Sequence, residues 1–232
     1  MSKFFNVTKR STFIGVSMCA AWAWGVSFVV SLTVLQDKGL VPFWIWVTMN
    51  SLAVPLFGYV VLKLPYLGQI VKHPFIKTVM VVIQLFSVMI NMQAVYEVGL
   101  IAGFSHMGST IAAVVTGLFF VLLVYKDGLF RAMLTDNFQW YIALIGLVIL
   151  ITMGAANGET KSIPIGNHEP DIRWAFYAWI LLFCGPFVDL QGWQRARLAI
   201  KEKEYASFNI AGFFFFLYMM LILVFAHFVQ IL

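Results

Sequence analysis

Charged residues are scarce in this chain of 232 residues. Only 11% of the residues are Asp, Glu, Lys or Arg, whereas 62% are hydrophobic and the mean hydropathy is +0.90. A soluble globular fold has too little interior to hold so much apolar surface. The apolar runs are continuous rather than alternating, which excludes a transmembrane β-barrel. The composition therefore predicts an all-α, multi-pass protein of the cell membrane, with the lipid bilayer as its main surroundings.

Cysteine is nearly absent as well. Cys19 and Cys184 lie in apolar segments without a CxxC or Cys/His spacing, which excludes a disulfide framework and a zinc site. The sequence also lacks the motifs of serine hydrolases, zinc proteases and phosphate-binding loops, and it lacks paired carboxylates at one depth. We therefore expect no enzyme, no catalytic residues and no metal site. The net charge of +5 is interpreted as a sign of membrane orientation, so no nucleic-acid partner is expected.

Long apolar runs make up most of the remaining sequence. A helix needs about 20 apolar residues to cross the hydrocarbon core of a bilayer. Short polar connections separate the runs, apart from a longer polar loop at 157–171. One transmembrane domain over residues 1–232 is expected, with seven helices at 11–36, 42–64, 75–97, 105–126, 138–154, 172–191 and 207–231.

The positions of the basic residues predict the orientation of these helices. If the N-terminus lies inside, only Lys38, Lys161 and Arg173 of the 15 Lys and Arg residues fall on the outer side, which leaves 12 inside. Such an excess of inner positive charge is typical of multi-pass proteins and places the C-terminus outside. Arg195 belongs to the inner group and is interpreted as an anchor at the membrane surface, with a gate as the alternative.

The sixth predicted helix contains the strongest candidate for a functional site. Gly185-Pro186 is expected to kink or break the helix, and Asp189 puts an ionisable group within the apolar span. Such a group usually faces a cavity, an ion or a partner. The alternative is that Asp189 lies at the inner membrane surface and pairs with Arg195 or Arg197 in water. Three further candidate residues follow within two turns: Gln191, Trp193 and Gln194.

The first predicted helix has a similar interruption at Trp22, Trp24, Gly25 and Ser27. Two interpretations remain open. Small residues let helices pack closely in a membrane. Alternatively, the helix unwinds at Gly25, so that backbone carbonyls and the Ser27 hydroxyl bind a cation while the tryptophans shape a cavity.

The third predicted helix carries a polar stripe. Gln84, Ser87 and Asn91 fall on one helical face because they are spaced three and four residues apart. Buried amides of this kind either cross-link helices or line a pathway, and both interpretations remain open.

Residues 189–196, Asp-Leu-Gln-Gly-Trp-Gln-Arg-Ala, resemble the D-Q-x-x-W-Q-R-A stretch of the sodium:solute symporter family, with Leu190 standing where that pattern has Gln. The segment Trp22-Ala23-Trp24-Gly25-Val26-Ser27 is similar to the first core helix of such transporters, which is unwound at the substrate and ion site. The resemblance covers the first seven core helices. It implies a five-plus-five inverted-repeat fold in which core helices 1 and 6 are broken and run in opposite directions.

The leading hypothesis is transport of a small polar solute through a midplane site between the first, third and sixth helices, and whether a cation is coupled to it, as in symport, is left open. The eighth core helix, which supplies hydroxyl ligands to sodium in the family, lies beyond the resemblance. No cofactor is therefore expected, and a monovalent cation such as sodium is left open. The second repeat would stop after two of its five helices, so a truncated homologue or completion by a second membrane subunit is expected.

Two other functions remain open. The first is a non-transporting accessory or assembly subunit, which packs against a second membrane subunit or forms a homo-oligomer. The second is a complete seven-helix facilitator without ion coupling.

Overall fold

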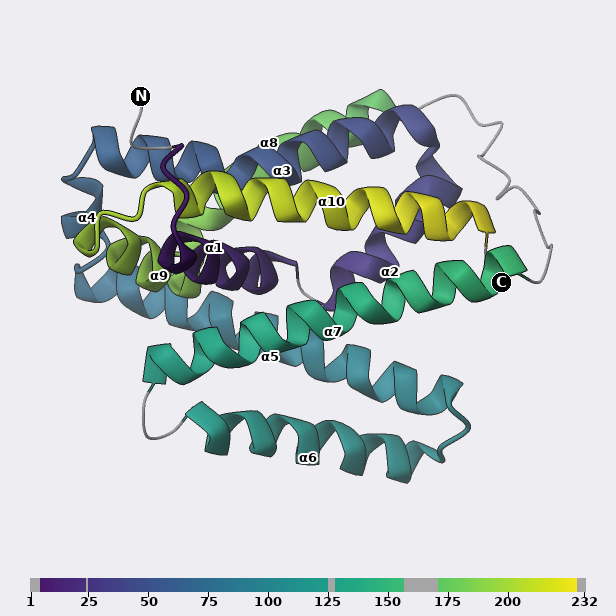
Figure 1. The fold of residues 1–232 in the computed structure, drawn as a ribbon. Helices are drawn as coiled ribbons and strands as arrows, with labels where there is room; N and C mark the ends of the chain where they lie inside the picture. Colours follow the sequence, from purple (N-terminus) through teal and green to yellow (C-terminus); the bar gives the residue numbers. More distant parts are fainter. Residues whose placement is uncertain (1–4, 24, 125–127, 157–170, 229–232) are drawn as a thin grey trace.

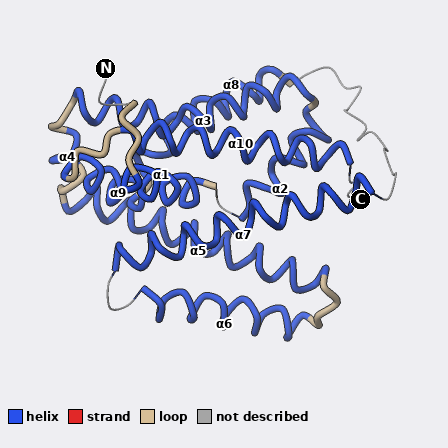
Figure 2. Tube along the Cα trace, in the orientation of Figure 1, coloured by secondary structure: helices blue, strands red, loops and turns tan. Residues whose placement is uncertain are grey.

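The chain is helical almost throughout in its computed structural model, which describes residues 5–23, 25–124, 128–156 and 171–228. No strand occurs among these residues (Figure 2). The helices are α1 Lys9–Trp22, α2 Gly25–Thr33, the π-helix η2 Val34–Lys38, α3 Leu40–Lys63, α4 Leu67–Ile70, α5 Pro74–Ile101, α6 His106–Val124, α7 Gly128–Ala156, α8 Ile172–Val188, α9 Leu190–Lys201 and α10 Ala206–Phe228.

Several of these helices have the length and composition of membrane spans. Within the described residues, α3, α5, α7 and α10 are each long and apolar enough to cross a bilayer. The number of spans rises to six if each of two bent pairs is one span. These pairs are Lys9–Trp22 with Ser27–Lys38, bent by 58°, and Ile172–Val188 with Leu190–Lys201, bent by 62°. The length and apolarity of these helices support the predicted all-α fold and a membrane location.

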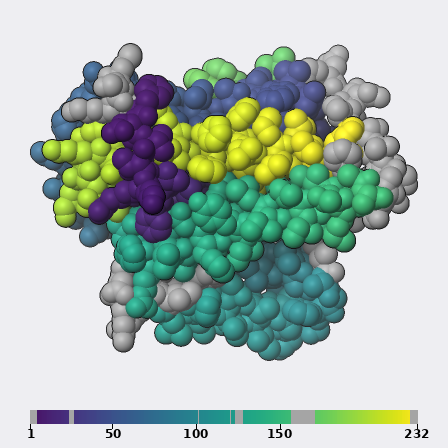
Figure 3. Space-filling model, in the orientation of Figure 1, coloured from purple at the N-terminus to yellow at the C-terminus, as the bar shows by residue number. Residues whose placement is uncertain are grey.

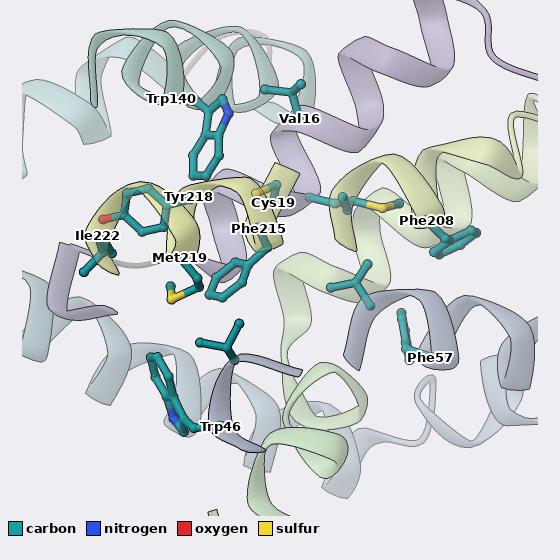
Figure 4. Packing of buried hydrophobic residues seen from close by; sticks show 14 of the residues in the cluster. Val16, Cys19, Trp46, Phe57, Trp140, Phe208, Phe215, Tyr218, Met219 and Ile222 are labelled. Atoms are coloured by element: carbon teal, nitrogen blue, oxygen red, sulfur yellow. The ribbon is translucent and has the colours of Figure 1, made fainter. Parts of the chain in front are cut away.

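Helix α10 forms the centre of the packed core. It contacts α1, α3 and α7, and it crosses the middle of the molecule in Figure 1. Its side chains Phe215, Met219 and Ile222 are at most 1% exposed, and Figure 4 shows them among buried residues of the neighbouring helices. The core therefore joins the beginning and the end of the chain.

Helices α5 and α6 form a hairpin that is joined more loosely to the rest (Figure 1). They pack mainly on each other, and α5 also touches α2 and α9. Only 11% of the most apolar stretch of α5 is buried, compared with 56% for α3. In a membrane, most of the α5 surface would therefore contact lipid or another protein.

Asp171 begins α8 and ties it to the end of η2. Its Oδ1 accepts a hydrogen bond from the backbone N–H of Trp174 at 3.0 Å, and its Oδ2 lies 3.0 Å from Nζ of Lys38. The bond from Trp174, followed by that from Lys38, lowers the pKa of the Asp171 carboxyl from its ordinary value of 3.8. This acidic N-cap satisfies a backbone donor that the first turn of α8 leaves free.

Candidate binding site between the two broken helices

The break in the sixth predicted helix lies at Asp189, not at Gly185-Pro186. Helix α8 passes through Pro186 and ends at Val188, and Asp189 has extended backbone angles. Proline lacks only its own N–H, so the helix loses one bond and continues for most of a turn. The backbone N–H of Asp189 donates to the carbonyl of Gly185 at 3.1 Å. The Gly185 carbonyl, which a break at Gly185-Pro186 would have left without this partner, thus already accepts a hydrogen bond.

Asp189 starts α9 as its N-cap. Its Oδ1 accepts from the backbone N–H of Gln191 at 3.0 Å, and its Oδ2 accepts from that of Gly192 at 2.8 Å. Both donors belong to the first turn, which has no helical acceptor for them, and a carboxylate is favoured at the positive end of a helix. Asp189 pairs with neither Arg195 nor Arg197. The Arg195 guanidinium donates to the Asp136 carboxylate, and Arg197 donates to the Gly68 carbonyl at 3.4 Å.

The first predicted helix is also interrupted, immediately before Gly25. Helix α1 ends at Trp22, and α2 begins at Gly25. Trp24, one of the predicted site residues, lies outside the described residues. The carbonyl of Ser27 accepts a hydrogen bond from the Ser31 hydroxyl, so the next turn of α2 already occupies it.

The two interruptions meet where Trp22 packs against α8. A Cβ atom on Gly185 would lie 2.3 Å from Cη2 of Trp22, so only glycine leaves room for the indole ring at this position. Close by is a cavity of about 10 Å³, at the lower limit for holding one water molecule. Its lining comes from α1, α3 and the α8–α9 break: Met18, Trp22, Val54, Phe57, Pro186, Asp189 and Gly192.

Trp22 and Asp189 are the two lining residues whose side chains carry nitrogen or oxygen atoms. The indole Nε1 of Trp22 is buried and has no hydrogen-bond partner, which is costly in an apolar setting. Each Asp189 oxygen accepts one backbone N–H and has a further lone pair. Asp189 therefore offers a negative acceptor beside the cavity, whereas the Trp22 Nε1 is enclosed by the surrounding packing in this closed arrangement.

Other predicted residues of α9 lie beside the cavity or away from it. The Trp193 ring packs edge-on against Phe57, with ring centroids 5.1 Å apart, and its Nε1 donates to the Phe187 carbonyl at 2.9 Å. Gln191 contributes its backbone N–H to the cap. Gln194 is exposed and does not line the cavity.

The third wall of the cavity comes from α3, not from the predicted third span. Gln84 and Asn91 of α5 do not line it, and the Asn91 side chain donates to the Ser87 carbonyl of its own helix at 2.9 Å. Val54 and Phe57 of α3 fill this place. Two residues of the α5 polar stripe, Ser87 and Asn91, thus bond to carbonyls of their own helix.

A buried polar cluster next to α9 was not predicted. Arg195 is only 2% exposed, although it was interpreted as a surface anchor. Its guanidinium donates to the Ser17 hydroxyl at 2.7 Å, to the Gln191 carbonyl at 3.1 Å and to the Asp136 carboxylate. Ser17 donates in turn to Asp136 at 2.6 Å. This Arg195–Asp136–Ser17 cluster connects α9, α7 and α1 by charge-assisted hydrogen bonds.

The sequence held a faint signal for this cluster. Asp136 was assigned to the connection before a span expected at 138–154, but α7 begins ten residues earlier, at Gly128. Met133, Asn137 and Trp140 are buried on one face of that longer helix. Their spacing of four and three residues could have extended the predicted helix and drawn attention to Asp136.

Comparison with known proteins identifies no relative: no family model, no curated protein and no solved structure matches the chain.

Proposed function

We propose that the protein transports a small polar solute across a membrane, through a site formed where the two broken helices meet. The observation that carries the proposal is the cavity lined jointly by Trp22 of α1 and Asp189 of the α8–α9 break. Broken helices expose polar backbone and side chains at membrane depth only where these line a cavity or are buried in protein. The proposed topology has seven spans with the N-terminus inside and the C-terminus outside, as in the front part of a sodium:solute symporter.

In this proposal the transporter needs a further, open state, because the cavity is closed in the arrangement described above. A cavity of about 10 Å³ has no room for a solute larger than water. Trp22 closes it against Gly185, so solute entry requires the Trp22 ring to move off α8. The Asp189 carboxylate would then attract the positive or hydrogen-donating part of the solute, or a coupling cation.

Uptake into proteoliposomes tests the role of Asp189. The purified chain is assayed against a panel of radiolabelled polar solutes, with and without a sodium or proton gradient, and Asp189→Asn is assayed beside it. Asparagine is as good an N-cap as aspartate, so this variant keeps the start of α9 while losing the charge. Uptake that is saturable in the native chain and at least tenfold lower in Asp189→Asn supports the proposal.

The exposed Gln194 provides the control, because Gln194→Ala should leave uptake unchanged. Uptake by Asp189→Asn equal to that of the native chain would refute the role of the carboxylate. Uptake that persists without any ion gradient would favour the uncoupled facilitator over symport.

An accessory subunit is the second candidate function. The small volume of the cavity favours it, since a packing role needs no room for a solute. This alternative predicts that the purified chain takes up none of the solutes and that it co-purifies with another membrane protein. Both measurements come from the same preparation.

A further inference from the structure

Residues 63–77, which we call the α4 corner, connect α3 to α5 and expose several apolar side chains. Helices α3 and α5 are each long and apolar enough to cross a bilayer, so in a membrane their connection lies at its surface. Tyr66, Ile70 and Phe75 are 54%, 47% and 68% exposed, and no residue of α4 is buried. Figures 1 and 3 show the corner at the same end of the molecule as α9. Large apolar side chains exposed at this level indicate insertion into the membrane interface.

Three exposed lysines belong to the α4 corner. Lys63 ends α3, and Lys72 and Lys77 flank the start of α5. In the part of the chain that the structure describes, no ion pair joins these lysines to a carboxylate. Lys63 Nζ lies 5.8 Å from the centre of the Tyr59 ring instead. Residues 38–96 contain neither Asp nor Glu, so this stretch of the chain brings no negative charge to the corner.

Helix α9 adds a fourth positive charge to the corner. Arg197 is exposed, and its Nη2 donates to a backbone carbonyl of α4 at 3.4 Å, which holds the guanidinium beside the corner. The two carboxylates that follow α9 are engaged elsewhere. Glu202 lies 2.9 Å from Arg10, and Glu204 accepts a hydrogen bond from the Thr8 hydroxyl at 2.8 Å. The α4 corner therefore carries positive charge that no ion pair within the described residues neutralises.

We propose that the α4 corner binds the anionic phospholipid headgroups of one membrane leaflet. The three lysines and Arg197 lie at the level of the phosphate groups, while Tyr66, Ile70 and Phe75 insert among the acyl chains next to them. A lipid fits better than a soluble anion, because a soluble anion would leave these apolar side chains in water. Basic clusters beside a membrane span attract anionic lipids, and each Lys or Arg near the surface strengthens binding about fivefold. The proposal rests on the membrane location of the protein and not on transport.

Native mass spectrometry of the purified full chain in detergent tests the proposal. Phosphatidylglycerol and phosphatidylcholine with identical acyl chains are titrated separately, and the dissociation constants of the first bound lipid are compared. Phosphatidylglycerol is expected to bind at least about tenfold more tightly, because its net negative charge meets several uncompensated cations. Soluble glycerol phosphate, which has the phosphate but no acyl chains, should not displace the bound phosphatidylglycerol.

The corner variant, which combines Lys72→Gln with Lys77→Gln, removes two exposed charges but no ion pair, so it should keep the native circular dichroism and gel-filtration profile. Its affinity for phosphatidylglycerol is expected to fall about 25-fold, the product of two fivefold losses, whereas its affinity for phosphatidylcholine should not change. Lys9→Gln combined with Lys203→Gln is the matched control, because it removes the same charge from exposed lysines outside the corner. This control should bind phosphatidylglycerol like the native chain.

Three results would overturn the proposal. The first is equal affinity of the corner variant and the native chain for phosphatidylglycerol. The second is an equal loss of affinity in the corner variant and the control, which indicates an effect of net charge only. The third is displacement of phosphatidylglycerol by glycerol phosphate, which indicates a site for a soluble anion. None of these results affects the comparison of uptake between Asp189→Asn and the native chain, so the two proposals fail separately.

Discussion

Replacing Arg195 by methionine should destabilise the protein strongly. Methionine keeps most of the apolar stem but removes the guanidinium, which is 2% exposed and donates to Ser17, Gln191 and Asp136. The Asp136 carboxylate then keeps only the Ser17 hydroxyl among these partners. A buried charge left without its counter-charge is the main source of the expected loss.

The size of the effect follows from the burial of the two partners. Removing one member of a buried ion pair costs about 3–5 kcal/mol. The Asp136 side chain is 18% exposed, so water relieves part of this cost and the lower end applies. A loss of about 3 kcal/mol changes the unfolding equilibrium by about 100-fold. Changing Asp136→Leu as well removes the stranded charge and should recover at least about 2 kcal/mol.

The measurement is unfolding of the purified protein by SDS in mixed micelles, followed by the circular dichroism of its helices. Arg197→Met is the matched control, because Arg197 is an exposed arginine of the same helix. Its effect should stay within about 0.5 kcal/mol. Equal unfolding free energies for Arg195→Met and Arg197→Met would refute the assigned role of the cluster. The role of the cluster would also be refuted if the losses of unfolding free energy caused by Arg195→Met and Asp136→Leu simply added in the double variant.

Three further predictions use the same unfolding assay. Gly185→Ala should destabilise by about 1–3 kcal/mol because its Cβ would overlap the Trp22 ring, and an unchanged midpoint would contradict this packing. Gly146→Ala has nothing within 4 Å of the new Cβ and should stabilise α7 by about 0.5–1 kcal/mol, so a loss of stability there would be inconsistent with the structure. Asp171→Asn should lower stability above pH 3.8, where the lowered pKa of Asp171 keeps its carboxylate charged. The difference from the native chain should vanish as pH falls through that lowered pKa, and a difference that persists in acid would exclude the ionic contribution.

The two helix interruptions could be predicted because their causes are local. Glycine at 25, proline at 186 and a carboxylate at 189 each carry a backbone or solvation cost that a continuous apolar helix does not tolerate easily. The exact position of the second break was missed by three residues. A helix can continue past proline, and it ended only where Asp189 could cap the next one.

The walls and partners of the site could not be predicted in the same way. Val54 and Phe57 have no polar signal that distinguishes them from other residues of an apolar span. Arg195 and Asp136 are 59 residues apart, and the count of positive charges cannot tell an arginine that faces water from one that faces a carboxylate. Such pairings depend on how α1, α7 and α9 pack, which hydropathy does not encode.

The cap at Asp189 has a mechanical consequence for the two broken helices. Asp189 supplies its own acceptors to the first turn, so α9 is a separate helix. It is joined to α8 through this extended residue and through the hydrogen bond from Trp193 Nε1 to the Phe187 carbonyl. Rotation about that residue need not break hydrogen bonds inside either helix. Arg195 fastens the same helix to α1 through Ser17. If α9 rotates while the hydrogen bond between Arg195 and Ser17 is kept, α1 must move with it. The cavity residues on α1 and those at the start of α9 would then move together.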